Sequence, residues 1–158
     1  MTKGFVFLEL LYVIVIIGIL SAIAIPAYQD YIYRLNIAEG LVVIQPVQQY
    51  IEEYYAHTGR FPDTLENEDS TLPNHFATKR LVDINIVQGA IQMRYRGSAI
   101  GKQSPAYLTL RPVVDVTQYS RPIRWLCGNK QEVSPDLVVI GENMTDLDNR
   151  HLPAECRN

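Results

Sequence analysis

The sequence predicts an α+β protein: one long N-terminal helix, with a membrane half and an amphipathic half, packs on a four-stranded antiparallel sheet, and a disulfide-closed loop ends the chain. Three observations lead to this prediction. An apolar segment occupies the first thirty residues, a helical amphipathic pattern follows it, and alternating strand patterns precede a segment bounded by Cys127 and Cys156. The 158 residues, of which 20% are charged, have the length and composition of one ordinary globular domain.

The first predicted element is a membrane helix from Phe5 to Ala27. Glu9 is the one charged residue in this range, and no Lys or Arg occurs between Lys3 and Arg34. About 20 mostly apolar residues suffice to cross a bilayer. A cleaved secretory signal would have a shorter apolar core and a polar region after it, whereas here an amphipathic helix follows directly. The positive flank at Lys3 predicts a cytoplasmic N-terminus, with the rest of the chain on the other side.

Glu9 is unusual at this depth, because an acid in the middle of a membrane helix costs roughly 2.5–3.5 kcal/mol on insertion scales. One interpretation is that its side chain reaches back to the lipid headgroups. The interpretation we favour is that Glu9 meets a cationic partner inside an assembly, since ionisable groups within membranes generally have a function.

A set of residues in this segment resembles the N-terminus of type IV prepilins. The set comprises Lys3-Gly4-Phe5, Glu9, Gly18-Ile19-Leu20 and Ala22-Ile23-Ala24-Ile25-Pro26. In that family a membrane peptidase cuts after the glycine and methylates the new N-terminal residue. The resemblance implies cleavage between Gly4 and Phe5, an N-methylated Phe5, and assembly through Phe5, Glu9 and Pro26. Val6 and Phe7 stand where the family more often has Thr and Leu.

The short leader is similar to that of type IVa pilins, which implies a division of the chain into three parts. Residues 1–4 are the leader, residues 5–27 the membrane-spanning half of the helix, and residues 28–158 a periplasmic or extracellular head with the disulfide loop 127–156. The implied function is a structural subunit of a type IVa pilus (fimbrium), whose filament supports adhesion, twitching motility or DNA uptake. The implied partners are other copies of the chain in a helical filament, the prepilin peptidase and the pilus assembly machinery. The precursor would reside in the inner membrane and the product in the extracellular pilus.

Electrostatics favours this role for Glu9. Cleavage after Gly4 would leave a positive amine at Phe5, one helical turn from Glu9. In a staggered filament the Glu9 carboxylate of one subunit could meet the amine of its neighbour, so that two charges that are each unfavourable in lipid compensate each other.

Beyond the membrane, apolar residues recur at steps of three and four, which predicts one helix from Phe5 to Tyr55. These residues are Ile37, Leu41, Ile44, Val47, Ile51 and Tyr54. Pro26 and Pro46 should bend or loosen the helix, with a real break at Pro46 as the alternative. Gly59 and Pro62 predict its end. The polar connection at 59–80 contains Asp63, Glu66, Glu68 and Asp69, without the spacing of an EF-hand, and is predicted to be a solvated loop.

Four strands are predicted at residues 82–86, 91–95, 106–116 and 122–127. In the first, Val82, Ile84 and Ile86 alternate with polar residues, and Gln88-Gly89 is a typical hairpin turn before the second. Pro112 indicates an edge or a bulge in the third strand. The sheet would pack against the amphipathic half of the helix to give a two-layer head.

Cys127 and Cys156 both lie on the predicted non-cytoplasmic side, where oxidants favour a disulfide. The bond would close a loop of about 30 residues and contribute roughly 3–4 kcal/mol in the chain-entropy model. Two unpaired buried thiols are the alternative. The residues around both cysteines are similar to the disulfide-bounded C-terminal region of type IVa pilins, which in that family is exposed on the filament.

The sequence predicts no enzyme, no cofactor and no metal site. His57, His75 and His151 are isolated and expected in surface or loop positions, and no phosphate loop or nucleophile elbow occurs. Other members of the same family, a type II secretion pseudopilin or a minor pilin, share the N-terminal motif, although paired cysteines argue against the pseudopilin. A membrane-anchored periplasmic enzyme is the alternative from another class.

Nucleic acid is not an indicated partner. The net charge of −3 excludes a strongly basic nucleic-acid-binding protein. Five arginines of the sheet region could meet DNA phosphates, but solvated positions are the favoured interpretation: Arg94, Arg96, Arg111, Arg121 and Arg124.

Overall fold

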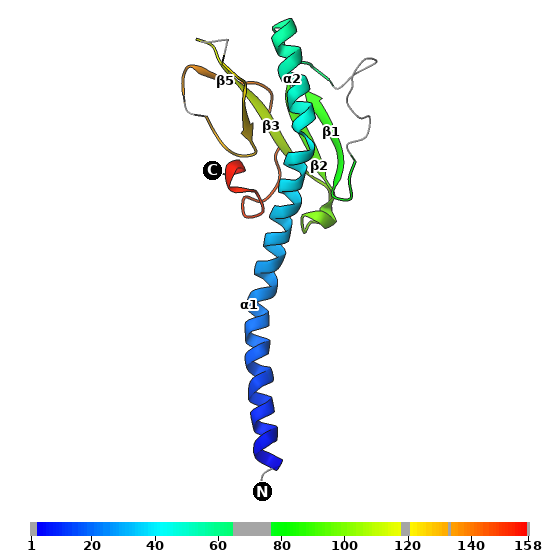
Figure 1. Cartoon of the computed structure of the whole chain (residues 1–158), viewed down its shortest axis with the longest axis vertical. Coiled ribbons are helices and arrows are strands. Elements are labelled where there is room, and N and C mark those ends of the chain that lie inside the picture. Colours follow the sequence, from blue (N-terminus) through cyan, green and yellow to red (C-terminus); the bar gives the residue numbers. More distant parts are fainter. Residues whose placement is uncertain (1–2, 65–76, 118–120, 133, 158) are drawn as a thin grey trace. The chain divides into compact units, whose positions relative to one another are not determined.

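The computed structural model describes residues 3–64, 77–117, 121–132 and 134–157 (Figure 1). The chain divides into two compact units, residues 1–32 and residues 33–158. The first contains the N-terminal part of helix α1, and the second contains the rest of the helical segment and all the strands. Most of the predicted acidic loop, with Glu66, Glu68 and Asp69, and the isolated His75 lie outside the described residues.

The predicted long helix is confirmed as two helical segments separated by one residue. Helix α1 covers Lys3–Val43 and continues through Pro26, and helix α2 covers Gln45–Thr58. Ile44 separates them because Pro46, at the start of α2, has no N–H to donate to the preceding turn. The Ile44 carbonyl accepts from the N–H groups of Val47 and Gln48, at 2.9 and 3.0 Å, so helical hydrogen bonding resumes directly after the break. The break at Pro46 is therefore limited to a single residue.

Helix α2 ends where the sequence predicts. Gly59 adopts a left-handed conformation with φ 69°, and its N–H donates to the carbonyl of Tyr55 at 2.8 Å. Glycine suits this position because it has no Cβ to collide with the backbone. Along the amphipathic pattern Ile37, Ile44, Val47 and Ile51 are fully buried, whereas Tyr54, predicted on the same face, is 37% exposed.

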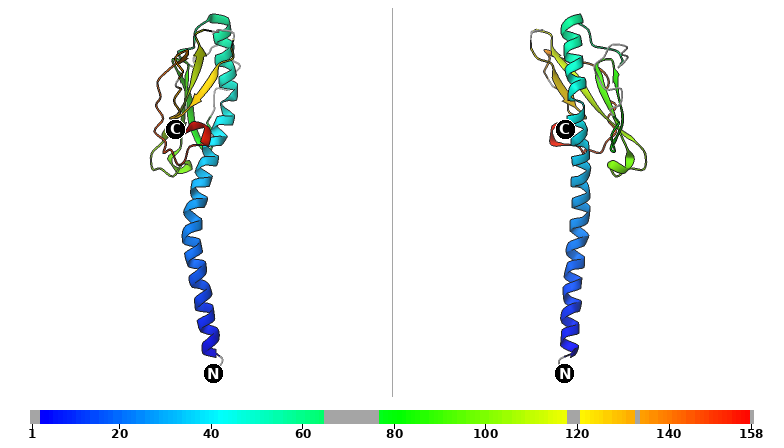
Figure 2. Two further views of the ribbon diagram at one scale, coloured as in Figure 1. Left: turned by 90° about the vertical axis from the view of Figure 1, so that its left-hand side faces the viewer. Right: turned by 45° about the vertical axis from the view of Figure 1, so that its right-hand side comes forward.

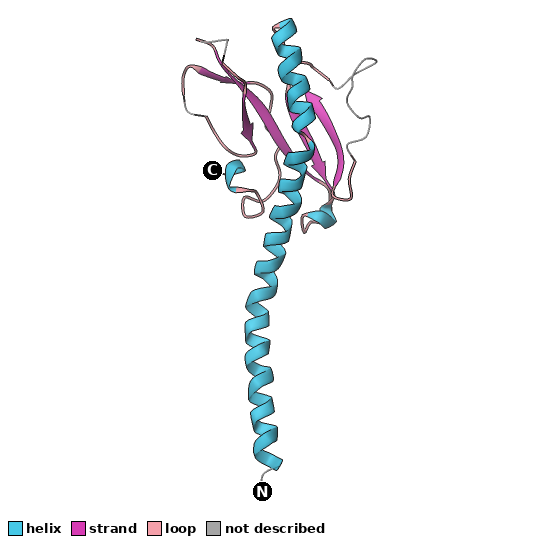
Figure 3. Cartoon of the chain, viewed as in Figure 1, coloured by secondary structure: helices cyan, strands magenta, loops and turns pink. Residues whose placement is uncertain are grey.

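The sheet has five antiparallel strands (Figure 3). They are β1 (Leu81–Val87), β2 (Ala90–Tyr95), β3 (Ala106–Asp115), β4 (Arg124–Cys127) and β5 (Leu137–Val139). The order is β1-β2-β3-β4, and β5 pairs with β3. The four predicted strands are confirmed, and β5 is an addition that the sequence analysis did not predict.

The β1–β2 hairpin turns at Gln88 and Gly89, as predicted, with φ values of 50° and 80°. Positive φ at both turn residues matches the right-handed twist of the flanking strands. The prediction of which β1 residues face the core was wrong by one residue at the start of the strand. A register shift between Leu81 and Asp83 leaves Val82 half-buried, and Leu81 enters the core with 1% exposure.

Strand β3 is the centre of the sheet. Along one edge β2 pairs with its residues 106–110 and β5 with its residues 113–115, while β4 pairs along the other edge. Pro112 lies between the β2 and β5 partners, so its missing N–H interrupts neither pairing. Its carbonyl accepts from the N–H of Ile140 at 2.9 Å.

One face of the sheet packs against the helix through a buried tyrosine. Tyr95 is fully buried, and its hydroxyl donates to the carbonyl of Ile37 at 2.9 Å. Burial raises the pKa of this hydroxyl. The tyrosine ring fits because residue 40 is a glycine: a Cβ there would lie 2.7 Å from Tyr95 Cζ and overlap the hydroxyl.

Replacing Gly40 by Ala should therefore destabilise unit 33–158 by about 1–3 kcal/mol, the usual range for overpacking. The measurement is urea unfolding of the detergent-solubilised chain, followed by circular dichroism. Gly18→Ala is the matched control, because a Cβ at this other α1 glycine has no neighbour within 4 Å. Adding Tyr95→Phe to Gly40→Ala should restore part of the loss. A Gly40→Ala protein as stable as the parent would contradict this packing.

Candidate functional site

The N-terminal part of α1 presents an apolar surface along its whole length. The helix is long and apolar enough to cross a membrane, and no residue of its most apolar stretch is buried within the chain. Phe5 is 75% exposed. Other exposed apolar residues on this helix are Val6, Phe7, Leu8, Leu10, Ile14, Ile17, Leu20 and Ile23. Such a surface requires lipid or other apolar helices as its surroundings.

Glu9 lies within this apolar surface and is exposed. It makes no ion pair with any other described side chain. Phe5 precedes it by four residues, so the two lie one turn apart on the same side of α1. The predicted cleavage bond between Gly4 and Phe5 falls in the first turn of α1, where the backbone N–H groups have no partner within the helix. The site residues at this end are thus presented outward by a single helix.

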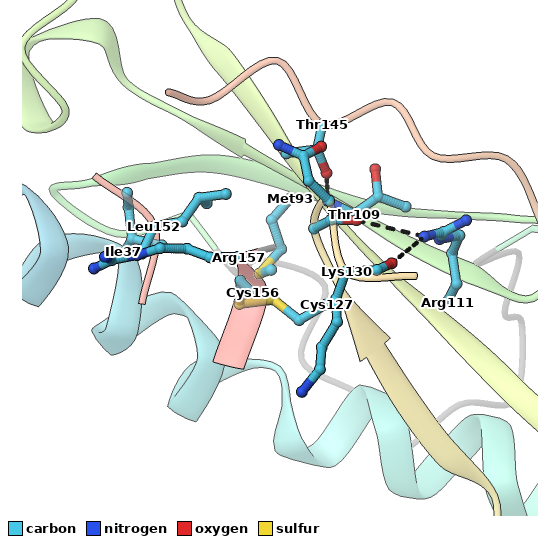
Figure 4. The surroundings of a disulfide bond; sticks show 12 residues. Ile37, Met93, Thr109, Arg111, Cys127, Lys130, Thr145, Leu152, Cys156 and Arg157 are labelled. Atoms are coloured by element: carbon cyan, nitrogen blue, oxygen red, sulfur yellow. Dashed lines mark hydrogen bonds between the residues drawn. A yellow bond between two sulfur atoms is a disulfide. The ribbon is translucent and has the colours of Figure 1, made fainter. Parts of the chain in front are cut away.

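The second candidate site is the region of the disulfide (Figure 4). Cys127, the last residue of β4, is bonded to Cys156 in the short helix η2 (Ala154–Cys156), with 4.5 Å between their Cα atoms. Both cysteines are buried. The turn after Cys127 depends on Gly128, whose φ is 59° and where a Cβ would lie 2.8 Å from the carbonyl oxygen of Cys156. The disulfide-closed loop predicted from the sequence is confirmed.

The disulfide loop covers the second face of the sheet (Figure 2). Thr109 of β3 is fully buried there. Its N–H donates to Thr145 Oγ1, and its Oγ1 accepts from the N–H of Met144, both at 3.0 Å. Two residues earlier, the Tyr107 N–H donates to Asp146 Oδ1 at 2.6 Å. The loop residues therefore continue the hydrogen bonding of the sheet.

The loop also contributes to the core. Leu147 is 4% exposed and Leu152 is fully buried. His151, predicted as a surface or loop residue, lies in a loop but is 3% exposed, with its ring edge-on to Tyr33 at a centroid distance of 5.1 Å. His57, in the last turn of α2, is exposed as expected. Leu147 and Leu152 stand five residues apart, a spacing with neither strand nor helix period, so no pattern in the sequence indicated that they are buried.

Most of the arginines considered for phosphate contacts are engaged within the chain. Arg94 makes a two-pronged bond to Asp83 at 3.2 and 2.8 Å, and this contact raises the pKa of the guanidinium. Arg111 donates to the carbonyl of Lys130 at 3.2 Å (Figure 4), and burial lowers its pKa. Arg121 and Arg124 form ion pairs with Asp115 and Glu132, respectively. These four side chains are therefore structural.

A groove of about 360 Å³ lies between Leu41 of the helix and Trp125 of β4. Three of its lining residues are engaged within the fold, because Trp125 Nε1 donates to Glu52 at 2.8 Å and Arg124 forms an ion pair with Glu132. Among the described residues, no group of three His, Cys, Asp or Glu side chains is placed to hold a metal ion. The candidate site residues therefore lie in the N-terminal helix and in the disulfide loop.

Comparison with known proteins gives a consistent result. A family model described as pilin, a bacterial filament protein, matches residues 34–157. The chain is 28% identical to a type IV major pilin protein, PilE1, of Neisseria gonorrhoeae, over 99% of this chain and 87% of that protein. It is 30% identical to the fimbrial protein EcpC of Eikenella corrodens, over 99% of this chain and 91% of that protein. A fimbrial protein of Neisseria meningitidis serogroup B is 26% identical over 99% of this chain.

Proposed function

The chain belongs to the pilin family and is a structural subunit of a bacterial pilus, and we propose that it is made as a type IVa prepilin, processed at its N-terminus and assembled through its N-terminal helix. The observation that carries the proposal is Glu9, an exposed carboxylate with no described ion-pair partner in an otherwise apolar helix. Adhesion, twitching motility or DNA uptake would then be properties of the filament and not of a site on the single chain.

Before assembly, the helix from Phe5 to Ala27 holds the precursor in the inner membrane. Lipid covers its apolar surface, and the positive flank at Lys3 keeps the N-terminus on the cytoplasmic side. Unit 33–158 folds on the other side, where the disulfide between Cys127 and Cys156 forms. The pilus assembly machinery then moves the subunit out of the bilayer.

During assembly, the exposed apolar surface of one helix is covered by the helices of neighbouring copies. Removal of residues 1–4 creates a positive amine at Phe5. The Glu9 carboxylate of an adjacent, staggered subunit compensates that amine in the apolar filament core. The charge pair exists only when two copies are in register, so it selects the correct stagger as well as contributing stability.

Processing should depend on Gly4. The peptidase must bind the backbone at this position closely, which a glycine allows because it has no side chain. The first turn of α1 can open at little expense, since its N–H groups have no intrahelical partner. We expect Gly4→Val to leave uncut precursor in the membrane, detected by the intact mass of the membrane-bound chain.

Gly18→Val is the control for this experiment, because it adds the same side chain to the same helix away from the cleavage bond. It should be processed normally. Efficient cleavage of the Gly4→Val chain, giving an N-terminal Phe5, would show that the peptidase does not require glycine at this position.

A further inference from the structure

Three cationic residues lie on neighbouring backbone segments at the end of the sheet where β1 begins and β2 ends. They are Lys79, Arg96 and Lys102, here called the basic end. The Arg96 N–H donates to the carbonyl of Arg80, the neighbour of Lys79, at 2.8 Å. The Lys102 N–H donates to the carbonyl of Gly97, the neighbour of Arg96, also at 2.8 Å.

The three cations of the basic end have no acidic partner among the described side chains, unlike the cations around them. Arg80 pairs with Glu39 of α1, and Arg94 pairs with Asp83. None of Lys79, Arg96 and Lys102 forms an ion pair with a described carboxylate. Lys102 Nζ donates to the backbone carbonyl of Asp146 at 2.6 Å but forms no ion pair with that residue's carboxylate, which accepts from the Tyr107 N–H. Among the residues that the structure describes, this end is therefore locally positive, although the whole chain carries a net charge of −3.

Chain connectivity keeps the basic end near the bilayer. Asn36 of α1 donates from Nδ2 to the carbonyl of Ala99 at 2.7 Å, within the loop that joins Arg96 to Lys102. Asn36 follows Ala27, the last residue of the apolar segment, by nine residues. Even a fully extended chain of that length reaches only about 30 Å. The loop between Arg96 and Lys102 is therefore tethered to the end of the apolar segment, and some orientations of unit 33–158 bring it to the headgroups.

We propose that the basic end binds anionic phospholipid headgroups while the subunit is held in the membrane, and so orients unit 33–158 on the bilayer surface before assembly. The inference rests on the proposed membrane-held precursor. Each Lys or Arg close to an anionic surface strengthens association about fivefold, and the attraction fades beyond roughly 8–10 Å. Two or three such cations are enough to select one orientation of a tethered unit.

Nucleic-acid phosphates carry the same negative charge as lipid headgroups, but the small number of cations at the basic end favours lipid. Proteins that bind DNA by charge typically make about 6–10 phosphate contacts. The basic end offers three cations, and the tether supplies the high local concentration of headgroups that a small cluster needs.

The test uses the full chain reconstituted in nanodiscs of phosphatidylcholine, with and without phosphatidylglycerol. Backbone hydrogen exchange is measured for residues 96–102. Exchange should be slower by about an order of magnitude in the anionic discs, and high salt should remove the difference. The double variant Arg96→Gln/Lys102→Gln should exchange equally in both lipids. The control Arg60→Gln/Lys130→Gln removes the same charge from two other exposed cations, which form no ion pair with a described carboxylate, and should keep the lipid dependence.

Each alternative outcome has a distinct meaning. Equal exchange of the parent chain in both lipids, or a lipid dependence that survives in Arg96→Gln/Lys102→Gln, overturns the inference while leaving the proposed function intact. A chain extracted from the discs by alkaline carbonate contradicts the membrane-held precursor and this inference with it. If the double variant instead weakens only the retention of detergent-solubilised chain on a duplex DNA probe, the basic end is a nucleic-acid surface and the lipid proposal is wrong.

Discussion

Replacing Glu9 by Leu should leave the subunit in the membrane at its normal level and nearly abolish filaments. Insertion should be unaffected or improved, because removing a lone carboxylate from lipid saves a few kcal/mol. In the filament, however, the Phe5 amine of the neighbouring subunit would lose its partner in an apolar environment. Breaking a buried pair by removing one partner typically costs about 3–5 kcal/mol. Immunoblots of membrane and sheared-filament fractions separate these two effects.

Glu9→Asp is the matched variant, because it keeps the charge and shortens its reach by one methylene. It should give an intermediate amount of filament. Glu9→Gln should resemble Glu9→Leu, since it keeps the size and polarity of the side chain but removes the charge. Normal piliation of the Glu9→Leu strain would show that the charge pair is dispensable and that our assembly mechanism is wrong.

Loss of the disulfide should have the next largest effect. Cys156→Ser should lower the stability of unit 33–158 by about 3–4 kcal/mol, the loop-closure contribution of a bond that closes roughly 30 residues. The structure predicts which residues lose the most protection. Residues near Cys156, including Leu152, should exchange their amide hydrogens fastest, whereas Met144 to Asp146 remain hydrogen-bonded to β3 through Thr109 and Tyr107.

Two comparisons isolate the bond from the substitution. The double variant Cys127→Ser/Cys156→Ser should match Cys156→Ser, and the reduced parent chain should show the same exchange pattern. The variant Thr145→Val should loosen Met144 to Asp146 and leave the disulfide end protected, the reverse of the disulfide variants. Uniform loosening of the whole sheet in Cys156→Ser would contradict the independent anchoring of the loop.

Elements with a long periodic pattern were predictable from the sequence, and so were turns that depend on adjacent residues. The apolar helix, its amphipathic continuation and the Gln88-Gly89 hairpin belong to this group, because each is encoded by neighbouring residues. The two-cysteine pairing followed from the compartment that the membrane helix predicts. The N-terminal site residues, Gly4, Phe5 and Glu9, came from a motif and remain predictions about processing and assembly.

The features that the sequence did not reveal depend on contacts between distant residues. Strand β5 has three residues without alternation, and it exists because the end of β3 extends beyond β2. In the sequence Thr109 is an ordinary strand residue. It is buried because the disulfide loop covers it. Gly40 carries no signal of its own, since its role is to admit the ring of Tyr95 from a strand far along the chain.

Two residues that fit a predicted pattern without being fully buried illustrate the same limit. Tyr54 continues the spacing of three and four, but it lies near the end of α2 and remains 37% exposed. Val82 continues the alternation of β1, but the register shift beside it admits Leu81 in its place. Periodicity thus identifies an element, while the packing partner decides which of its terminal residues enter the core.

The central claim is that this chain is assembled into a surface filament after cleavage at Gly4. The most direct measurement is mass spectrometry of filaments sheared from intact cells, together with the membranes left behind. We predict that the chain is a main protein of the filament fraction and begins at an N-methylated Phe5. Absence of the chain from the filaments, or assembled subunits that retain Met1 or Thr2, would contradict the account.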